Sequence, residues 1–205
     1  MTDVWVLGGG GHAKVVIATL QSDGKPVAGV FDDDKSKRGE VLLSARIDDV
    51  TPELSWWQAE ARSAMIAIGN NATRQRVADL PADWVTATHQ TADVHMSVRI
   101  GCGSLICAGV VVQPDAAIGR HVIANTTCSI DHDCVIGDFC HIAPGATLAG
   151  EVSIGDRAFV GAGATIIQGV KVGADALIGA GAVVISDVGD GEKVAGVPAR
   201  RLTND

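Results

Sequence analysis

Residues 129–141, SIDHDCVIGDFCH, bring two histidines, three aspartates and two cysteines into thirteen positions. Imidazole, carboxylate and thiol groups at this density could bind a metal ion, form a redox pair or transfer protons. Only side chains that point out of the core are available for such chemistry. The pattern of the surrounding sequence therefore has to decide among the three.

His132 and its acidic neighbours suit proton transfer. A neutral imidazole accepts a proton near pH 7, and an adjacent carboxylate can hold the ring in one orientation and strengthen it as a base. Asp131 and Asp133 are equally close in sequence, so spacing does not choose between them. The alternative is an inert surface histidine, and a second histidine at position 141 of the same segment weighs against it.

The segment lies inside a six-residue repeat. Every sixth residue from Val94 to Val184 is aliphatic, and the position two before each of them is Ala, Val, Ser or Cys. Neither a helix nor an ordinary strand has a period of six, whereas hexapeptide β-solenoids do. The repeat places Cys128, Cys134 and Cys140 at small inward positions, where we expect them to pack in the core.

The repeat resembles the left-handed parallel β-helix over residues 92–187, a little over five coils. In that fold three hexapeptides form one triangular coil, so residues 18 apart stack on each other. His141 directly precedes an inward residue and should point outward, and His132 should lie at a coil corner. Gly150 should then lie one strand spacing, about 4.8 Å, above His132, with its backbone N–H accessible beside the base.

A metal site is the rival interpretation of these histidines. Proteins that resemble gamma-type carbonic anhydrases hold zinc with three histidines between β-helical subunits. His121, His132 and His141 are the candidates here, but their spacings of 11 and 9 do not match the H-x4-H pair of that family. We therefore predict no metal. Cys102 and Cys107 lie off the small inward column, and the sequence suggests no function for them.

The first 90 residues follow a different pattern, in which short apolar segments alternate with helical ones. This alternation predicts a small parallel α/β sheet, shorter than a full dinucleotide-binding fold. We expect a nucleotide-sugar-binding α/β domain at 1–90 and a β-helix domain with a C-terminal tail at 91–205. The expected strands are 4–8, 27–34, 64–71 and 84–89, and the expected helices are 12–24 and 71–81.

The glycine-rich turn at residues 7–14, LGGGGHAK, follows the first strand and opens a helix. Gly8, Gly10 and Ala13 fit G-x-G-x-x-G/A, and Asp32 follows about 20 residues later. This pattern is typical of phosphate bound at a helix N-terminus. The short sheet argues against NAD, so we expect another nucleotide, with Asp32 or Asp33 near its ribose or base. A purely structural glycine turn is the alternative.

Composition excludes several classes of partner. The formal net charge is −8 and no stretch is strongly basic, so nucleic acid and anionic membrane surfaces are not expected partners. No apolar run approaches the roughly 18 residues that a membrane span needs. The five cysteines, together with a start that carries an aspartate and no positive charge, lead us to expect a cytoplasmic protein with reduced thiols.

Five segments together carry a family resemblance that covers nearly the whole chain: GGGGHAKVV, FDDD, AIGNN, IDHDCVIGDFCHIAPGATLAG and GVPARRL. They resemble nucleotide-sugar N-acetyltransferases and the related sialic acid O-acetyltransferases. The resemblance implies acetyl transfer from acetyl-CoA to the amino group of a nucleotide-linked sugar, such as a 4-amino-4,6-dideoxy sugar on GDP or UDP. It also implies a homotrimer with active sites between neighbouring β-helices. O-acetylation of a sialic-acid-like sugar and a non-catalytic sugar-binding or scaffold protein are the alternatives.

The resemblance also implies roles for individual residues. His132 corresponds to the catalytic base, Asp133 to the acid that orients it, and Gly150 to the backbone donor for the thioester oxygen. The AIGNN segment departs from the commoner AIGDN at Asn70, which leaves the preference for base and sugar open. The implied substrate-binding residues are Gly10, Gly11, His12, Asp32, Asp33, Asn70, Asn125 and His141. The implied acetyl-CoA-binding residues are His141, Gly150, Ala162, Gly196, Val197, Pro198, Ala199, Arg200 and Arg201.

Overall fold

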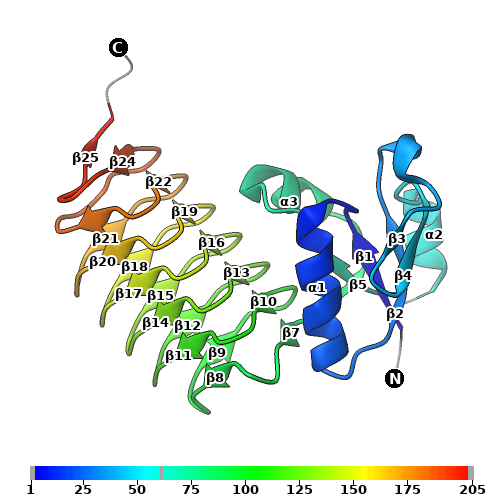
Figure 1. The fold of residues 1–205 in the computed structure, drawn as a ribbon, viewed down its shortest axis with the longest axis horizontal. Helices are drawn as coiled ribbons and strands as arrows, with labels where there is room; N and C mark the ends of the chain where they lie inside the picture. Colours follow the sequence, from blue (N-terminus) through cyan, green and yellow to red (C-terminus); the bar gives the residue numbers. More distant parts are fainter. Residues whose placement is uncertain (1–2, 61, 203–205) are drawn as a thin grey trace.

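The computed structural model describes residues 3–60 and 62–202, which form an N-terminal α/β unit followed by a long β-solenoid (Figure 1). The α/β unit has a six-stranded sheet in the order β3-β4-β2-β1-β5-β6. Its central strand β1 pairs in parallel with β2 and β5, as the expected βαβ alternation requires. Its strands are β1 Val4–Leu7, β2 Val27–Phe31, β3 Val41–Leu42, β4 Ala45–Asp49, β5 Ser63–Ile66 and β6 Asp83–Trp84. Its helices are α1 Gly11–Ser22, η1 Lys35–Lys37, α2 Leu54–Ala59 and α3 Asn71–Val77.

The α/β unit differs from the expected pattern in two places. The antiparallel β3–β4 pair and helix α2 were not predicted, because elements of two to six residues leave too short a periodic signal. The strand expected at 84–89 is divided. Its first part, β6, joins the N-terminal sheet, whereas β7 (Ala87–Thr88) pairs with the solenoid strand β10 (Leu105–Ile106). The solenoid pairing thus begins before residue 92.

The solenoid is a left-handed parallel β-helix with three flat faces. We name the faces by their strands: face 1 holds β7, β10, β13, β16, β19, β22, β24 and β25; face 2 holds β8, β11, β14, β17, β20 and β23; face 3 holds β9, β12, β15, β18 and β21. From β7 to β23, neighbouring strands in a face pair at a register of 18 residues, as in His141↔Phe159. At the C-terminal end β24 pairs with β22 at a register of 16, and β25 pairs with β24 antiparallel. Each coil thus consumes three hexapeptides, as the repeat predicts.

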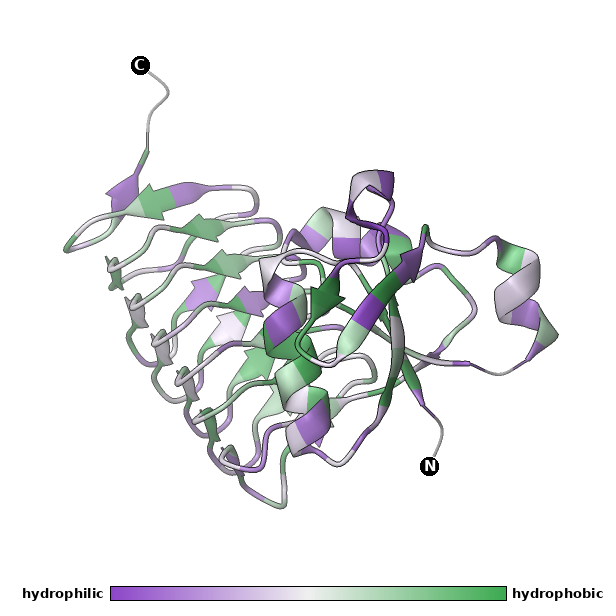
Figure 2. Cartoon of the chain, turned by 45° about the vertical axis from the view of Figure 1, so that its right-hand side comes forward, coloured by the Kyte–Doolittle hydropathy of each residue, from purple (hydrophilic) through white to green (hydrophobic). Residues whose placement is uncertain are grey.

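Most solenoid strands contain only two residues, one pointing outward and one inward. Their bounds are β8 Asp93–Val94, β9 Arg99–Ile100, β11 Val111–Val112, β12 Ala117–Ile118, β13 Ile123–Ala124, β14 Ser129–Ile130, β15 Val135–Ile136, β16 His141–Ile142, β17 Thr147–Leu148, β18 Ser153–Ile154, β19 Phe159–Val160, β20 Thr165–Ile166, β21 Lys171–Val172, β22 Leu177–Ile178, β23 Val183–Val184, β24 Lys193–Ala195 and β25 Arg200–Arg201. The apolar residues of these strands form the solenoid core (Figure 2).

The three cysteines of the small inward column are buried, as predicted. Cys128, Cys134 and Cys140 precede strands of faces 2, 3 and 1 respectively, so each lies at a different corner. Burial raises the pKa of the Cys128 and Cys140 thiols to about 12 and raises the pKa of Cys134 as well. Because thiolate is the reactive form, these side chains serve packing.

The corners of the prism repeat one backbone conformation. Asp115, Asp133, Glu151 and Arg157 are among the non-glycine corner residues with φ between about +57° and +63°. This left-handed conformation turns the chain sharply from one face to the next. We name each corner by the faces that it joins, so residues 131–134 form part of the 2–3 corner and residues 137–140 part of the 3–1 corner.

The α/β unit lies against face 1 of the solenoid. Helix α1 packs on β7 and β10, and helix α3 lies beside the later coils (Figure 1). Among the described residues, no helix is both long enough and apolar enough to cross a membrane.

Candidate active site

The imidazole of His132 projects from the 2–3 corner and is 53% exposed. Its Nδ1 contacts Asp133 Oδ2 at 2.8 Å, whereas Asp131 Oδ1 accepts the backbone N–H of His132 at 2.8 Å. Of the two candidate partners, Asp133 is therefore the one that contacts the ring. The hydrogen bond to Asp133 is the main cause that raises the pKa of His132 above its usual value, and Asp131 and Glu151 add to it.

The backbone of Asp133 explains this contact. Asp133 is the left-handed residue of its corner, with φ of +59°, and the turn places its carboxylate beside the preceding ring. An Nδ1 that donates to Asp133 leaves Nε2 as the free acceptor of the neutral imidazole. The arrangement is therefore that of a general base with an oriented ring.

Gly150 stacks on His132 as the 18-residue register predicts. A Cβ at Gly150 would lie 2.6 Å from both Cε1 and Nε2 of His132, so any side chain there would collide with the ring. The Gly150 N–H has no protein acceptor among the described residues, since the neighbouring ladder bonds come from Ala149 and Glu151. A backbone donor thus lies directly beside the basic nitrogen of His132.

The glycine turn of the α/β unit opens a cavity of about 380 Å³ at the N-terminus of α1. The residues Gly10, Gly11, His12, Asp32 and Asp33 all line it, and they are joined by Phe31 and Lys37. A Cβ at Gly10 or Gly11 would meet nothing within 4 Å, whereas the folded chain itself requires glycine at positions 8 and 9. The free space above Gly10 and Gly11 leaves room for close approach of a phosphate to the helix N-terminus.

Asp32 holds this cavity together. Its Oδ2 accepts the N–H of Gly9 at 2.6 Å and the ammonium of Lys37 at 3.0 Å, and its Oδ1 accepts the N–H of Asp34 at 2.9 Å. Partial burial alone would raise the pKa of Asp32, but these hydrogen bonds hold the pKa below its usual value. Asp33 is more open, and its carboxylate accepts the Thr51 N–H at 3.2 Å.

His141 points outward from face 1, as predicted, but the α/β unit covers it. Its Nε2 lies 3.1 Å from Asn125 Nδ2, so the amide donates and the imidazole proton resides on Nδ1. Burial, followed by the charges of Arg74 and His12, lowers the pKa of His141 to about 4. The rings of His12 and His141 lie 6.2 Å apart, so His141 continues the cavity toward the solenoid.

One chain does not bring all the predicted residues together. His132, Asp133 and Gly150 lie at the 2–3 corner, whereas His141 and the α/β cavity lie on face 1. In a triangular prism the 2–3 corner is the edge opposite face 1. A ligand seated over face 1 is thus out of reach of His132 from the same chain.

The remaining predicted residues lie on two further parts of the solenoid. The C-terminal segment Gly196–Arg201 forms the turn and second strand of the β24–β25 hairpin. This hairpin lies three to four strand spacings, about 14–19 Å, beyond β16 on face 1. Val197 is 72% exposed there, and Arg201 pairs with Glu192. Ala162 is exposed at the 1–2 corner, and the side chain of Asn70 caps α3 by accepting the Thr73 N–H at 2.9 Å.

The three histidines of the metal hypothesis do not converge. His121 is buried at the 3–1 corner with its ring stacked on Phe139 at 5.1 Å, away from the corner of His132. Within residues 3–60 and 62–202, no group of three or more His, Cys, Asp or Glu side chains is placed to hold a metal ion.

Sequence reasoning missed two residues at the junction of the two units. Arg74 and Asn71 of α3 bind backbone carbonyls of the solenoid corner. Their segment, NATRQRV, has the polar composition of an exposed helix, so no sequence signal marks either residue. Lys37 was also missed, although its position five residues after Asp32 could have suggested the ion pair.

Comparison with known families and proteins yields matches along the whole chain. Residues 3–80 match the PglD N-terminal domain, and residues 151–186 match the hexapeptide repeat of succinyl-transferase. The GDP-perosamine N-acetyltransferase of Escherichia coli is 35% identical over 160 residues, which cover 72% of this chain and 70% of that protein.

Solved structures are similar over both units together. A histidine-to-asparagine variant of perosamine N-acetyltransferase from Caulobacter crescentus, in complex with CoA and GDP-perosamine, has a TM-score of 0.94 at 39% identity and covers 100% of this chain and 98% of its own. The acetyltransferase domain of PglB from Neisseria gonorrhoeae, in complex with acetyl coenzyme A, has a TM-score of 0.88 at 33% identity and covers 98% of each chain.

Proposed function

Since the chain belongs to the family of nucleotide-sugar N-acetyltransferases, we propose that it transfers acetyl from acetyl-CoA to the amino group of a nucleotide-linked amino sugar. The single observation that supports this most directly is the His132–Asp133 pair, whose free Nε2 faces the Gly150 backbone. A 4-amino-4,6-dideoxy sugar is the proposed acceptor, because the similar enzyme from Caulobacter crescentus was crystallised with GDP-perosamine.

In the proposed mechanism, His132, Asp133 and Gly150 of the 2–3 corner each have one role. The neutral amine attacks the thioester carbonyl and loses a proton as the C–N bond forms, and Nε2 of His132 accepts that proton. Asp133 keeps the ring in the tautomer that leaves Nε2 free. The Gly150 N–H donates to the oxygen that becomes negative in the tetrahedral intermediate. The intermediate then collapses, the C–S bond breaks and CoA leaves with the proton from His132.

The α/β cavity is the proposed seat of the nucleotide. Its diphosphate would lie over Gly10 and Gly11 at the N-terminus of α1, with Asp32 and Asp33 toward the ribose or base. The sugar would extend past His12 toward His141 and Asn125. Because the pKa of His141 is lowered to about 4, that ring stays neutral at physiological pH and can hydrogen-bond to the sugar or acetyl group without repelling a cationic amine.

Acetyl-CoA is proposed to lie along face 1, from His141 toward the β24–β25 hairpin. Gly150 and Ala162 would border the thioester and pantetheine, and Gly196, Val197 and Pro198 would border the far end. Arg200 and Arg201, which are exposed beside that end, are the proposed contacts of the CoA phosphates. We place this chemistry in the cytoplasm, in agreement with five free cysteines.

The separation of His132 from face 1 supports a homotrimer. Since the 2–3 corner of one chain cannot reach a ligand on its own face 1, the corner must come from a neighbouring copy. Three copies around a three-fold axis would form three identical sites, each with a corner from one chain and a face from the next.

The reaction is tested with acetyl-CoA and a panel of GDP-, UDP- and CMP-linked sugars, with release of the CoA thiol as the readout. We expect turnover with a nucleotide-linked 4-amino sugar. Turnover with hydroxyl acceptors alone would instead establish O-acetylation, and binding of nucleotide sugars without any thiol release would establish a non-catalytic binding protein. Either result would refute the proposed reaction.

Shared sites are tested by mixing two inactive variants, His132→Ala and the double variant Asn125→Ala/His141→Ala. Random trimers from an equal mixture that is unfolded and refolded together would regain about a quarter of their sites, each with an intact corner facing an intact face. No recovery in mixed trimers, or a monomeric mass in light scattering, would contradict the shared site.

A further inference from the structure

Arg74 of helix α3 is buried to 1% exposure between the α/β unit and the solenoid. Burial lowers the pKa of its guanidinium to about 10, so it stays charged at neutral pH. No carboxylate within residues 3–60 and 62–202 forms an ion pair with it. A buried charge is retained only where hydrogen bonds replace its water, so the partners of Arg74 show what it holds.

On the α/β side, Arg74 binds the loop that separates the nucleotide cavity from the solenoid. Its Nη1 donates to the carbonyl of Ile68 at 3.0 Å and to that of Gly69 at 3.2 Å. Both Ile68 and Gly69 line the cavity, and Gly69 also lines a second cavity of about 390 Å³ between α3 and face 1. The guanidinium thus fixes the wall that the two cavities share.

On the solenoid side, the same guanidinium binds the corner that leads into His141. Nε donates to the carbonyl of His121 at 2.9 Å, and Nη2 donates to the carbonyls of Phe139 at 2.6 Å and Cys140 at 3.2 Å. The carbonyls of His121 and Phe139 accept no backbone N–H in the coil ladder of the described residues. These contacts hold the backbone directly before His141.

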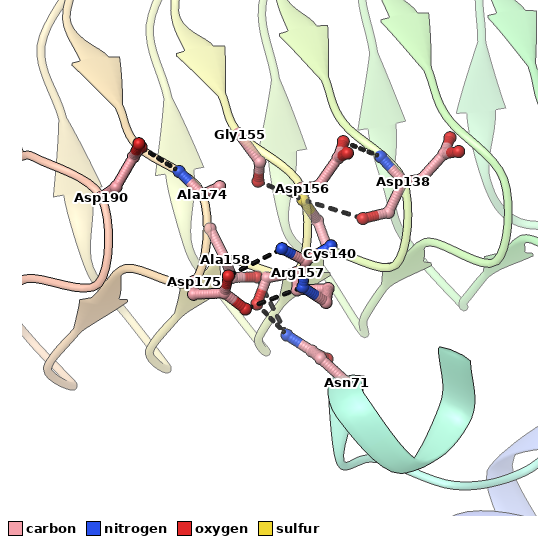
Figure 3. A network of polar contacts seen from close by, with 10 residues as sticks. All are labelled: Asn71, Asp138, Cys140, Gly155, Asp156, Arg157, Ala158, Ala174, Asp175 and Asp190. Carbon is pink, nitrogen blue, oxygen red and sulfur yellow. Dashed lines mark hydrogen bonds and ion pairs between the residues drawn. The ribbon is translucent and has the colours of Figure 1, made fainter. Parts of the chain in front are cut away.

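Asn71 extends the same contact by one coil (Figure 3). Its Nδ2 donates to the carbonyls of Arg157 at 2.8 Å and Ala158 at 3.1 Å. Its Oδ1 accepts from Arg74 Nη2 at 2.8 Å. Two neighbouring side chains of α3 therefore bind three successive coils of the 3–1 corner. A lysine could not replace Arg74, because an ammonium lacks the planar fork of five donors.

We propose that Arg74 is a positioning residue of the acetyl transfer, which clamps the nucleotide cavity to the coil of His141 and so fixes the acceptor amine relative to the thioester. This inference rests on the proposed function. Arg74 touches neither substrate, since its N–H groups are all directed at protein oxygens. Its effect passes through the Ile68–Gly69 loop and through the backbone that precedes His141.

The test compares Arg74→Lys and Arg74→Gln with Arg120→Gln, an arginine of the same corner that is exposed and pairs with Asp138. A misplacement of about 1 Å can cost about 10²-fold, so we expect kcat/KM for the nucleotide sugar to fall about 10- to 100-fold in both Arg74 variants. The KM for acetyl-CoA and all kinetic parameters of the control should stay within about twofold, and the trimer mass should be unchanged in every variant. A KM for acetyl-CoA that rises as much as the KM for the nucleotide sugar, or a loss of the trimer, would indicate a merely structural role and overturn the proposal.

Amide hydrogen exchange tests the clamp without turnover. In Arg74→Lys we expect faster exchange at Phe139 and at His141, whose N–H groups donate to Arg120 and Ala158. Exchange at Val160 and Ile166, in the coils beyond them, should be unchanged. If the Arg74 variants do not fold, Asn71→Ala replaces them in the test. We expect the same residues to exchange faster, by a smaller factor. Wild-type exchange and wild-type kinetics in a folded variant would refute the clamp alone. If the wild-type protein transfers no acetyl group, the proposed function is refuted. Exchange differences in the Arg74 variants would then show that the clamp only joins the two units.

Discussion

The 2–3 corner around His132 and the face 1 surface around His141 place two histidines, nine residues apart, in opposite environments. The ring of His132 is 53% exposed, and the hydrogen bond to Asp133 raises its pKa. The α/β unit covers the ring of His141, and burial lowers its pKa to about 4. One imidazole can therefore take up a proton in the neutral range, and the other stays neutral throughout it.

The difference follows from register and from what covers each position. Nine residues are one and a half hexapeptides, so the chain moves from a corner to the middle of a face. The corner supplies a left-handed residue that brings Asp133 to the ring. The face supplies a flat surface on which α1 and α3 lie, so its outward residue is desolvated. The same residue type thus becomes a base at one position and a neutral hydrogen-bonding group at the other.

The largest expected effect on kcat comes from replacing each of the two histidines by alanine. Loss of a general base costs roughly 10²- to 10⁴-fold, so His132→Ala should lower kcat by that factor while acetyl-CoA still binds. His141→Ala should cost less, because that ring transfers no proton in the proposed mechanism. Steady-state kinetics at pH 7.5, about one unit above the usual pKa of histidine, with calorimetric titration of acetyl-CoA, would measure both.

A matched control for this comparison is His95→Ala. His95 also lies at the 2–3 corner, where its Nδ1 contacts Ser97 rather than a carboxylate. Its replacement should leave kcat within about twofold, as for most surface substitutions. Near wild-type turnover in His132→Ala would refute the assignment of the base and favour direct attack by an amine that is already neutral.

The next largest expected effect on kcat comes from a substitution at Gly150, beside His132 in the 2–3 corner. In Gly150→Ala the new Cβ would lie 2.6 Å from Nε2 and Cε1 of His132, so the ring must move away. Displacement of about 1 Å can cost about 10²-fold, and we expect a loss of kcat of that order, with His141 unaffected. The chemical shifts of the two imidazoles, followed by NMR, would show which ring has moved.

Gly173→Ala is the control for crowding. A Cβ there would lie 2.4 Å from both Asp190 Oδ1 and Asp190 N, which is at least as tight, but in a coil that neither His132 nor the Arg74 and Asn71 side chains contact. It should lower thermal stability and leave kcat per folded protein unchanged. Equal losses of kcat in the two variants would mean that Gly150 matters for coil stacking rather than for the base.

The solenoid could be predicted closely because its physics is local and repeated. An outward or inward direction follows from the position within six residues, and this placed the three buried cysteines, His132, His141 and Gly150 correctly. The α/β unit could be predicted only in outline. The β3–β4 pair and α2 are too short for a periodic signal, and the division of residues 84–89 depends on which sheet edge each strand meets.

The spacing of residues could not choose between Asp133 and Asp131 as the partner of His132, and only the family resemblance implied Asp133. Both residues have the same type and the same spacing, and only the left-handed backbone at Asp133 brings its carboxylate to the ring. Burial of His141 and the role of Arg74 depend on how the two units pack. Packing between units that are distant in sequence leaves no pattern along the chain.

The smallest expected effect is a shift in the pH dependence of kcat/KM when the partner of His132 is replaced. Asp133→Asn removes the main cause that raises the pKa of His132, so the acid limb of kcat/KM should move to lower pH. It should lower kcat by less than His132→Ala does, because a weaker and less oriented base remains. The amine of the acceptor also titrates, but its contribution is the same for both proteins with one substrate and cancels in the comparison.

The sign of the accompanying stability change follows from the same shift. Because the pKa of His132 is raised in the folded state, its interaction with Asp133 stabilises the fold below the unfolded pKa of about 6.5 and is lost as pH rises through the folded value. Asp133→Asn should therefore reduce the melting temperature at pH 5.5 slightly more than at pH 8.5.

Asp131→Asn should shift the acid limb of kcat/KM in the same direction as Asp133→Asn but by less, because Asp131 accepts the backbone N–H of His132 and does not contact the ring. A larger shift from Asp131→Asn than from Asp133→Asn would assign the orienting role to Asp131, and an unmoved acid limb in both variants would mean that His132 is not the titrating base.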